Sequence, residues 1–350
     1  MKTDWEQTTL GNKFDIYQPQ TLAKNDLDNG QYPVYGANGI IGYHSKYNHE
    51  EPQVLVTCRG ATCGTVNLSK AYAWINGNAM VFKPKEKDID LHFLKHFLIA
   101  GIDLSVAITG AAQPQITRQS LTQIKIKIPP ISEQKRIAAI LDKADEIRRK
   151  REQAIAKLEK LAQSIFVEMF GNPNAKNPKF NQQKLTDFFN FKTGKLDSNA
   201  ASINGKYPFF TCSRENFWID SYAFDEEALL LAGNNANADY SVKYYKGKFN
   251  AYQRTYVINI SHNNSYVYAK ACLEFMLKEF KTVSKGSSTK YLTMGIFERM
   301  QIQVPPIALQ EEFAKRINQI EKLKADNTMA LANHNALFAS LQQQAFSGNL

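Results

Sequence analysis

Two histidines one helical turn apart are the most obvious metal-binding candidates in this sequence. His92 and His96 are spaced i and i+4, which places two imidazoles on one face of a helix. Apolar residues interleave with them between positions 91 and 98, and no carboxylate pattern completes a ligand set. We interpret both as partly buried helix histidines. Four cysteines form no CxxC pair, so we expect buried or reduced thiols and no metal site; they are Cys58, Cys63, Cys212 and Cys272.

Three further segments could act on phosphate or nucleotides. Glu279-Phe280-Lys281 carries the residue types of a metal-dependent nuclease but ends an apparent helix, so we interpret it as a solvated face. Thr193-Gly194-Lys195 lacks the spacing of a phosphate-binding loop. The basic run 148–151 could contact phosphate or a partner subunit. The alternative is a solvated helix face, because acidic residues flank the run. We find no glycine-rich loop for S-adenosylmethionine and no NPPF or DPPY segment, so we predict no catalytic residue and no cofactor.

Composition and charge favour a globular protein with an anionic partner. The chain has 350 residues, of which 43% are hydrophobic, enough for two or more cores. Its formal charge of +10 favours nucleic acid, although many basic proteins bind none. The longest apolar runs are too short to span a membrane, and the first residues lack the apolar core of a signal peptide. We therefore expect a cytoplasmic protein without membrane contact.

The chain repeats itself at a lag of 175 to 176 residues, half its length. Tyr32-Pro33 matches Tyr207-Pro208, and the apolar run 54–56 falls on 229–231. A two-residue slip then puts Gly60 opposite Gly233. The sequence is therefore two copies of one plan.

The closest match between the copies is the entry into a long helix. IKIKIPPISEQ (124–134) corresponds to MQIQVPPIALQ (300–310), and in each case two prolines end a strand. In the first copy, Ser132 is a plausible residue of the first helical turn. Apolar residues then recur with coiled-coil spacing. They are Ile137, Ile140, Ala144, Ile147, Ala154, Leu158, Leu161 and Ile165 in the first copy, and Phe313, Ile320, Leu323, Ala330, Leu337 and Leu341 in the second.

Polar residues interrupt both seams one repeat apart, at Arg151 and Asn327. If the helices pair antiparallel under a pseudo-twofold axis, these two side chains face each other and fix the register. The alternative is that both lean out to solvent.

The remaining blocks, 1–128 and 172–304, mix short β-rich runs with Gly and Asn turns and one helical stretch each, at 90–100 and 265–279. We therefore predict an α+β fold: two pseudo-symmetric α+β domains joined by two long helices, 129–171 and 305–350, that form an antiparallel coiled coil. The polar loops of the two blocks differ, as reading two different targets would require.

As a whole, the chain resembles specificity subunits of type I restriction-modification systems. The resemblance is carried by IPPISEQKRIAAILDKADEIRRKREQAIAKLEKLAQSIFVEMFG and its echo VPPIALQEEFAKRINQIEKLKADN, each preceded by a glycine-bearing loop, ITGAAQPQI and VSKGSSTKYL. It implies that 1–128 and 172–304 are target-recognition domains and that the helices are spacers. It also implies a non-catalytic subunit that binds double-stranded DNA with a bipartite target and recruits two methyltransferase (modification) subunits, which restriction subunits join in the full complex.

Candidate base-reading residues follow from this resemblance, because Arg, Lys, Asn and Gln supply the hydrogen bonds of major-groove readout. In the first domain they are Asn38, Tyr43, His44, Arg59, Thr62, Gln113 and Gln115. In the second they are Arg214, Asn216, Trp218, Asn234, Asn235, Asn237, Lys285, Ser287 and Lys290. For each, the alternative is a turn asparagine or half-buried aromatic that supports its own loop. We expect the nearby glycines, Gly110 and Gly286 among them, to form turns. The competing functions are a single-chain nuclease or methyltransferase, which the missing motifs disfavour, and a coiled-coil scaffold without DNA binding.

Overall fold

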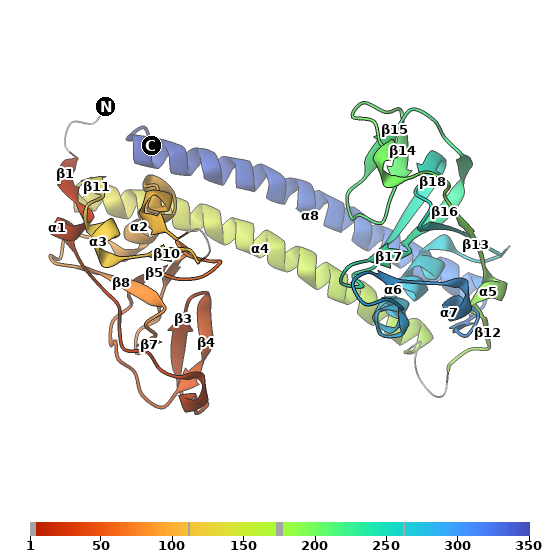
Figure 1. The fold of residues 1–350 in the computed structure, drawn as a ribbon, viewed down its shortest axis with the longest axis horizontal. Helices are drawn as coiled ribbons and strands as arrows, with labels where there is room; N and C mark the ends of the chain where they lie inside the picture. Colours follow the sequence, from red (N-terminus) through yellow and green to blue (C-terminus); the bar gives the residue numbers. More distant parts are fainter. Residues whose placement is uncertain (1–4, 111–112, 173–177, 262) are drawn as a thin grey trace. The chain divides into compact units, whose positions relative to one another are not determined.

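The computed structural model describes residues 5–110, 113–172, 178–261 and 263–350, which form two compact units. The first unit comprises residues 1–153 and 328–350, and the second comprises residues 154–327. Each unit thus holds one α+β domain together with parts of two long helices (Figure 1). Ala111 and Ala112 of the first glycine-bearing loop lie outside the described residues.

The first unit is built around a four-stranded sheet and a three-stranded sheet. Its strands are β1 (Glu6–Thr9), β2 (Phe14–Tyr17), β3 (Tyr32–Gly36), β4 (Gly39–His44), β5 (Val54–Thr57), β6 (Val66–Leu68), β7 (Trp74–Ile75), β8 (Ala79–Pro84), β9 (Ile108–Thr109), β10 (Gln115–Ile116) and β11 (Lys125–Ile128). The sheet orders are β2-β8-β5-β6 and β4-β3-β7, and β1-β11 and β9-β10 form two-stranded pairs. Every residue of β5 is buried, as expected for a central strand made of two valines, a leucine and a threonine.

One helix of this domain packs its apolar face into the core. The helical segments are α1 (Leu10–Lys13), η1 (Lys24–Asp26), α2 (Leu91–His96), η2 (Phe97–Gly101), η3 (Leu104–Ala107) and α3 (Arg118–Thr122). The carboxylate of Asp90 caps α2 by accepting a hydrogen bond from the Phe93 amide at 2.9 Å. The helix continues into the η2 turn, which confirms the predicted helical stretch 90–100. Phe93 is fully buried in the same core cluster as Phe14 and Phe82 of the sheet.

The second unit contains a six-stranded sheet in the order β13-β19-β16-β18-β14-β15 and the pairs β12-β21 and β17-β20. The strands are β12 (Gln182–Lys184), β13 (Phe189–Thr193), β14 (Tyr207–Phe210), β15 (Phe217–Ile219), β16 (Phe224–Ala232), β17 (Asn234–Asn235), β18 (Val242–Ala251), β19 (Thr255–Ile260), β20 (Lys290–Tyr291) and β21 (Gln301–Gln303). The helical segments are α5 (Leu185–Phe188), η4 (Ser198–Ala200), α6 (Tyr266–Val283) and α7 (Met294–Phe297). Ser265 caps α6, which extends four residues beyond the predicted stretch 265–279.

The two domains share one topology. In the first, β3 pairs antiparallel with β4 and parallel with β7, and in the second β14 pairs antiparallel with β15 and parallel with β18. The strand that begins each domain pairs with the strand that leads into a long helix, as β1 with β11 and β12 with β21. The predicted pseudo-symmetric α+β fold is therefore confirmed.

The two long helices are α4 (Ile131–Phe170) and α8 (Ile307–Ser347), of 40 and 41 residues. Each begins directly after a double proline, whose fixed φ suits the first turn and whose missing amide hydrogens end the strand before it. In the first unit, Arg148 of α4 lies over the ring of Phe338 of α8, 5.1 Å from its centroid. Nearer the start of α4, Arg136 donates to the carbonyl of Leu350, just past the end of α8.

The second unit contains the other half of the same pairing. The rings of Phe166 and Phe313 lie 5.6 Å apart, and Lys324 pairs with Glu159 at 2.9 Å. In both units, residue numbers rise along one helix as they fall along the other. The predicted antiparallel pairing is therefore confirmed.

The residues that fill the seam differ from the prediction. Four residues that the coiled-coil spacing assigned to the seam are exposed, namely Ile147, Leu161, Leu323 and Leu337. Phe166 and Phe338 are buried instead, because the ends of α4 and α8 also pack against a domain helix and not only against each other. A two-helix rule does not account for this third partner.

A buried glutamine ties α4 to the domain beside it. Gln134 is 1% exposed, and its Nε2 donates to the carbonyls of Asp88 and Pro129, each at 2.9 Å. Its Oε1 accepts from the amide of Asp90, the residue that caps α2. Gln134, rather than Ser132, therefore organises the start of the long helix.

The second unit repeats this glutamine lock. Gln310 is 0% exposed, and its Nε2 donates to the carbonyl of Pro305 and to Oδ1 of Asn264, both at 2.9 Å. Its Oε1 accepts from the amide of Ser265, the cap of α6. The last residue of the PPI-x-x-Q motif thus connects the start of a long helix to the start of a domain helix in both copies.

The four cysteines are free, with Cys58 and Cys272 buried. Burial raises the pKa of the Cys272 thiol to about 12. Among the described residues, no helix is both long and apolar enough to cross a bilayer.

Candidate nucleic-acid interface

The first unit gathers several predicted site residues where a hairpin docks on the end of β5. The hairpin is formed by β9 and β10, with Thr109 opposite Gln115. Gln115 also forms an antiparallel bridge with Arg59, and the Gly60 amide donates to the Pro114 carbonyl at 3.1 Å. The side chains of Arg59 and Gln115 are exposed, as is that of Gln113. Thr62 is half-buried within the loop that follows Arg59.

Asn38 lies near this cluster, whereas Tyr43 and His44 do not. Asn38 is exposed in the turn between β3 and β4, and the Thr57 hydroxyl, at the end of β5, donates to the carbonyl of Ala37 in that turn. Tyr43 and His44 occupy the far end of β4. The His44 imidazole is engaged within the domain, with Nδ1 3.2 Å from an oxygen of Asp28 and the ring 5.4 Å from that of Trp74.

The second unit forms an equivalent cluster. Lys285 and Tyr291 exchange backbone hydrogen bonds of 3.1 and 2.9 Å. Tyr291 also pairs with Asn234. In the first unit, Gln115 pairs with Arg59 in the same way. Lys290 lies opposite Asn235 on the same short ladder, and Ser287 is exposed at the tip of the hairpin.

This geometry corrects one part of the sequence alignment. Gly233 occupies the position of Cys58, not of Gly60: the amide of Leu292 donates to the Gly233 carbonyl as that of Ile116 donates to the Cys58 carbonyl. A Cβ on Gly233 would lie 2.3 Å from the carbonyl oxygen of Arg254. Close packing against this carbonyl, and not a turn conformation, therefore requires a glycine at position 233. Arg59 and Asn234 are therefore positional equivalents.

Gly110 and Gly286 confirm the expectation that glycines form turns here. They have φ values of +85° and +102°, in the left-handed region that favours glycine. A Cβ at either position would also collide with the carbonyl oxygen of the residue three positions further on. The distance would be 2.6 Å from Gly110 to Gln113 and 2.0 Å from Gly286 to Thr289. Both units thus present the same hairpin turn with different side chains around it.

Several polar residues of the second cluster already have partners. Asn235 Oδ1 accepts from the amides of Asn237 and Asp239 at 2.8 and 3.1 Å, so it supports its own loop. The guanidinium of Arg214 forms a bidentate pair with Asp239 at 2.8 Å. That pair is exposed and therefore weak, so it can be exchanged for another anion.

The other two candidates of the second unit lie on or beside β15. Asn216 is exposed, and its Oδ1 accepts from the ammonium group of Lys243 at 3.0 Å. Trp218 is exposed on β15 and lies opposite Pro208.

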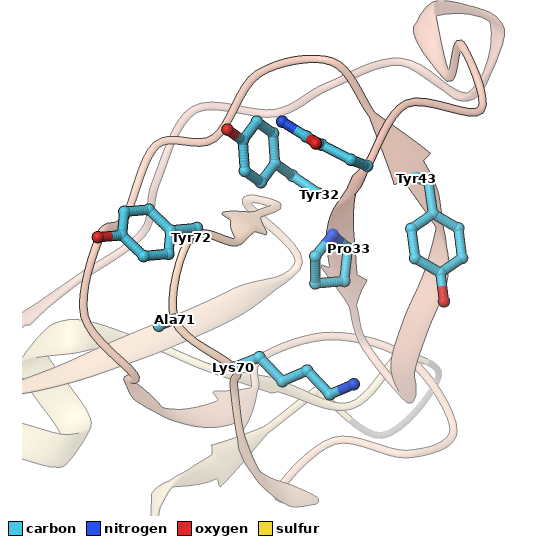
Figure 2. Close-up of a pocket in the computed structure, with 7 residues that line it drawn as sticks. Tyr32, Pro33, Tyr43, Lys70, Ala71 and Tyr72 are labelled. Atoms are coloured by element: carbon cyan, nitrogen blue, oxygen red, sulfur yellow. The ribbon is translucent and has the colours of Figure 1, made fainter.

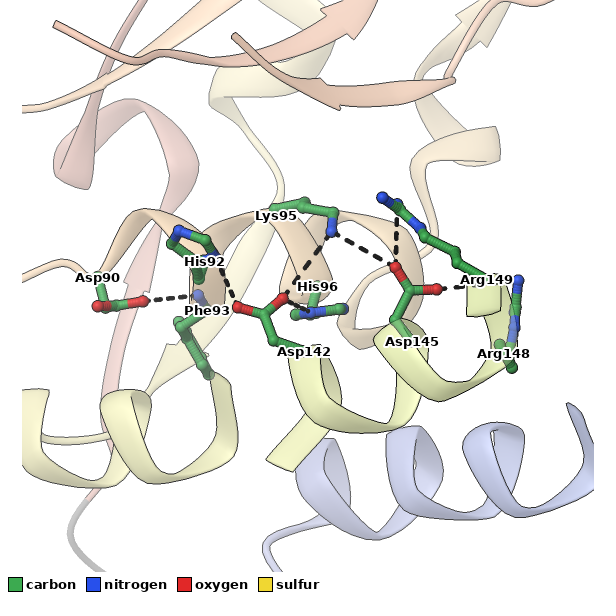
Figure 3. Close-up of polar contacts among 9 residues, drawn as sticks. All are labelled: Asp90, His92, Phe93, Lys95, His96, Asp142, Asp145, Arg148 and Arg149. Carbon is green, nitrogen blue, oxygen red and sulfur yellow. Dashed lines mark hydrogen bonds and ion pairs between the residues drawn. The ribbon is translucent and has the colours of Figure 1, made fainter. Parts of the chain in front are cut away.

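The histidine pair considered for metal binding has a structural role. Figure 3 shows His92 and His96 of α2 on either side of Asp142 of α4, with His92 Nδ1 at 2.5 Å and His96 Nε2 at 2.8 Å from its oxygens. Within the described part of the chain, no group of three or more His, Cys, Asp or Glu residues could hold a metal ion.

Sequence reasoning missed two features. Tyr291 takes the place of Gln115 in the second hairpin, a position that only the docked geometry reveals. A pocket near Tyr43 includes Lys70 and Tyr72, neither of which the repeat had singled out (Figure 2). The repeat had, however, aligned the neighbouring Tyr32-Pro33 with its second copy.

Chemically, the two clusters offer hydrogen-bond donors and positive charge. Guanidinium, ammonium and amide groups on loops held by a rigid sheet suit an anionic polymer that presents acceptors, such as the major groove of DNA.

Comparison with known proteins identifies the family. The model of the type I restriction modification DNA specificity domain matches residues 2–160 and again residues 177–333. The specificity subunit of the type I restriction enzyme EcoDI from Escherichia coli is 39% identical over 147 residues, which are 41% of this chain and 32% of that protein. A putative type I specificity subunit from Mycoplasma pneumoniae is 23% identical over 341 residues, 91% of this chain and 89% of its own length. The chain thus spans about a third of the Escherichia coli relative but most of the mycoplasmal one.

Solved structures show the same fold. The S subunit of a type I restriction-modification system from M. genitalium superposes with a TM-score of 0.71 at 18% identity, covering 99% of this chain and 96% of that one. Since the family model matches both halves of the sequence and each half has the same hairpin-and-helix plan, the chain belongs to the type I restriction modification DNA specificity domain family.

Proposed function

We propose that this chain is the non-catalytic specificity subunit of a type I restriction-modification complex, acting in the cytoplasm. In this proposal residues 1–128 and 172–304 are target-recognition domains, each reading one half of a bipartite site in double-stranded DNA. Residues 129–171 and 305–350 are the spacer helices. Two modification subunits that methylate DNA join the chain, and restriction subunits join in the full complex.

The observation that carries the proposal is the duplicated docked hairpin. One backbone frame, with a left-handed glycine at Gly110 or Gly286, presents Arg59 and Gln115 in one unit and Asn234 and Tyr291 in the other. A common frame with different hydrogen-bonding groups is what two readers of two different sequences need. The family match and the net charge of +10 point the same way.

Mapping methylated adenines across the host genome, with and without this gene, tests the proposal. We expect one bipartite motif to lose methylation in the deletion strain and to regain it when the gene is restored. An unchanged methylation pattern would contradict the proposal. Methyl transfer or DNA cleavage by the purified chain alone would favour the enzyme alternative.

A further inference from the structure

A pocket of about 480 Å³ lies in the first unit, away from the docked hairpin. Tyr32, Pro33, Tyr43, Lys70 and Tyr72 line it, and Figure 2 shows the Lys70 side chain extending across its floor toward the β3–β4 hairpin. Tyr43 is 47% exposed although it belongs to a strand. Among the residues that the structure describes, no carboxylate lies within ion-pair distance of Lys70.

The aromatic rings of this pocket support one another. Tyr47 packs edge-on against Tyr32 and Tyr72, with ring centroids 4.9 and 5.3 Å apart. Tyr72 has a φ of 50°, in the left-handed region that is unfavourable for a side chain such as tyrosine. Its amide donates to the Glu50 carbonyl at 3.0 Å, which holds it there.

The second unit carries similar residue types beside the corresponding strands. Pro208 lies opposite Trp218 in the β14–β15 ladder, as Pro33 lies opposite Tyr43 in the β3–β4 ladder. Tyr207 and Tyr222 pack edge-on with centroids 5.0 Å apart, and Lys248 Nζ lies 4.6 Å from the Tyr222 centroid. Trp218 is also 47% exposed. Each domain therefore carries a proline–aromatic pair, a tyrosine pair and a lysine.

The shared chemistry of the first-unit pocket and this second-unit group contrasts with the differing chemistry of the two hairpins. A ligand bound by both must be present in both half-sites. The two half-sites differ in sequence, so this ligand is not a particular base. The sugar–phosphate strand is common to all DNA. Lysine ammonium groups bind its phosphate oxygens, and aromatic and proline faces pack on its deoxyribose rings. Tyr43 lies five residues along β4 from Asn38, about 17 Å at the usual rise, so the pocket would meet the strand beside the bases that are read.

We propose that the pocket at Lys70–Tyr43 and the corresponding surface group at Lys248–Trp218 bind the DNA backbone without sequence preference. This inference rests on the proposed function and adds a second kind of contact to it: the hairpins choose the sequence, and the pocket and the surface group supply affinity.

The test is a titration of the full-length chain, in the complex in which it purifies, with a target duplex and an unrelated duplex over a series of salt concentrations. Lys70→Ala and Lys248→Ala should each weaken binding to both duplexes by the same factor, roughly five- to tenfold at ~0.1 M salt. Each should lower the slope of log K against log salt by about 0.9. Lys87→Ala removes the same charge from an exposed turn outside the pocket and should leave the slope unchanged.

The aromatic residues are tested in the same way. Tyr43→Ala and Trp218→Ala should weaken binding to both duplexes equally, whereas Tyr43→Phe should retain most of the affinity. A thermal unfolding curve for each variant shows that the fold is intact, and we expect no shift because both side chains are half-exposed.

The possible outcomes separate the two proposals. Target binding that survives Lys70→Ala and Lys248→Ala with an unchanged salt slope would overturn the pocket proposal and leave the proposed function standing. A changed base preference in Tyr43→Ala would make Tyr43 a base reader and overturn it as well. A wild-type complex that binds neither duplex would contradict the proposed function itself.

Discussion

The two units join domain to long helix through the same glutamine but through different packing. In the first unit, α2 meets α4 through polar groups, with Asp142 between His92 and His96 and with Lys95 4.0 Å from both Asp142 and Asp145 (Figure 3). Burial lowers the pKa of His96, so near neutral pH its ring is uncharged and donates a hydrogen bond to the Asp142 carboxylate.

In the second unit, aromatic rings pack the other end of α4 against α6. Phe166 stacks on Phe275 with centroids 4.5 Å apart, and Phe170 packs edge-on against Tyr268 at 4.8 Å and Phe313 at 5.2 Å. Phe166 and Phe170 are both buried. None of these five side chains changes charge between pH 5 and 8, because burial raises the pKa of Tyr268 above its already basic value.

The difference shows which parts of the junction the fold dictates. The glutamine lock recurs because the start of a long helix and the cap of a domain helix meet in the same way in both copies. The surrounding contacts can be ionic or apolar, and this choice decides how stable each junction is and how it responds to pH.

The largest expected effect is on the aromatic junction. Phe170→Ala should destabilise the second unit by about 3–5 kcal/mol, because it leaves a cavity among buried rings. Phe346→Ala is the matched change in the first unit, where Phe346 packs on Phe97 at 5.7 Å but is only partly buried. We expect roughly half the loss there. Hydrogen exchange resolved along the chain measures the stability of the two units separately. An equal loss of stability from Phe170→Ala and Phe346→Ala would show that the two junctions do not differ.

The glutamine lock should show no difference between the units. Gln134→Ala and Gln310→Ala each leave a buried backbone amide and carbonyl groups without a partner, so each should cost about 1–3 kcal/mol. The measurement is urea unfolding of both variants beside the wild type. A large loss in one and none in the other would mean that the motif glutamine supports only one junction.

Acidification should separate the two units. Because the pKa of His96 in the folded chain lies below its ordinary value of 6.5, the unfolded state binds a proton first, and the first unit loses stability as pH falls below 6.5. Burial would raise the pKa of Asp142, but its hydrogen bond from His96 and the nearby positive charges lower it, so its contribution is lost only below pH 3.8.

Hydrogen exchange between pH 7.5 and 5 checks this expectation. Protection of α2 should fall with pH in the wild type and become less dependent on pH in His96→Gln, while protection of α6 should stay level in both. A parallel decline of α2 and α6 would show that His96 is not the cause.

The smallest effect is expected at the partly exposed ion pair of the second unit. Lys324→Ala removes the contact with Glu159 and should cost less than about 1 kcal/mol, because exposed ion pairs are screened. The same loss at low and high salt would show that Lys324 acts through packing and not through charge.

Much of the fold could be predicted from the sequence. Strand alternation ended by Pro-Pro, followed by coiled-coil spacing, placed the start of both long helices, and the repeat predicted two similar domains. The seam prediction was wrong at Ile147, Leu161, Leu323 and Leu337 because sequence spacing cannot indicate a third packing partner. The glutamine lock was not foreseen, because the partner of Gln134 in the domain lies 44 residues earlier in the chain.

The candidate interface was predictable only in part. Loop composition selected Arg59 and Gln115 but could not show that they share one backbone bridge. It could not show either that Arg214 is already paired with Asp239, since that contact depends on how two loops fold together.

If the two hairpins read separate half-sites, methylated-adenine mapping of two double variants should show it most directly. Arg59→Ala with Gln115→Ala should relax base preference in one half of the bipartite motif only. Asn234→Ala with Lys290→Ala should relax the other half only, with the spacer length unchanged in both. Relaxation of the same half by both pairs, or an unchanged motif in both, would contradict the account.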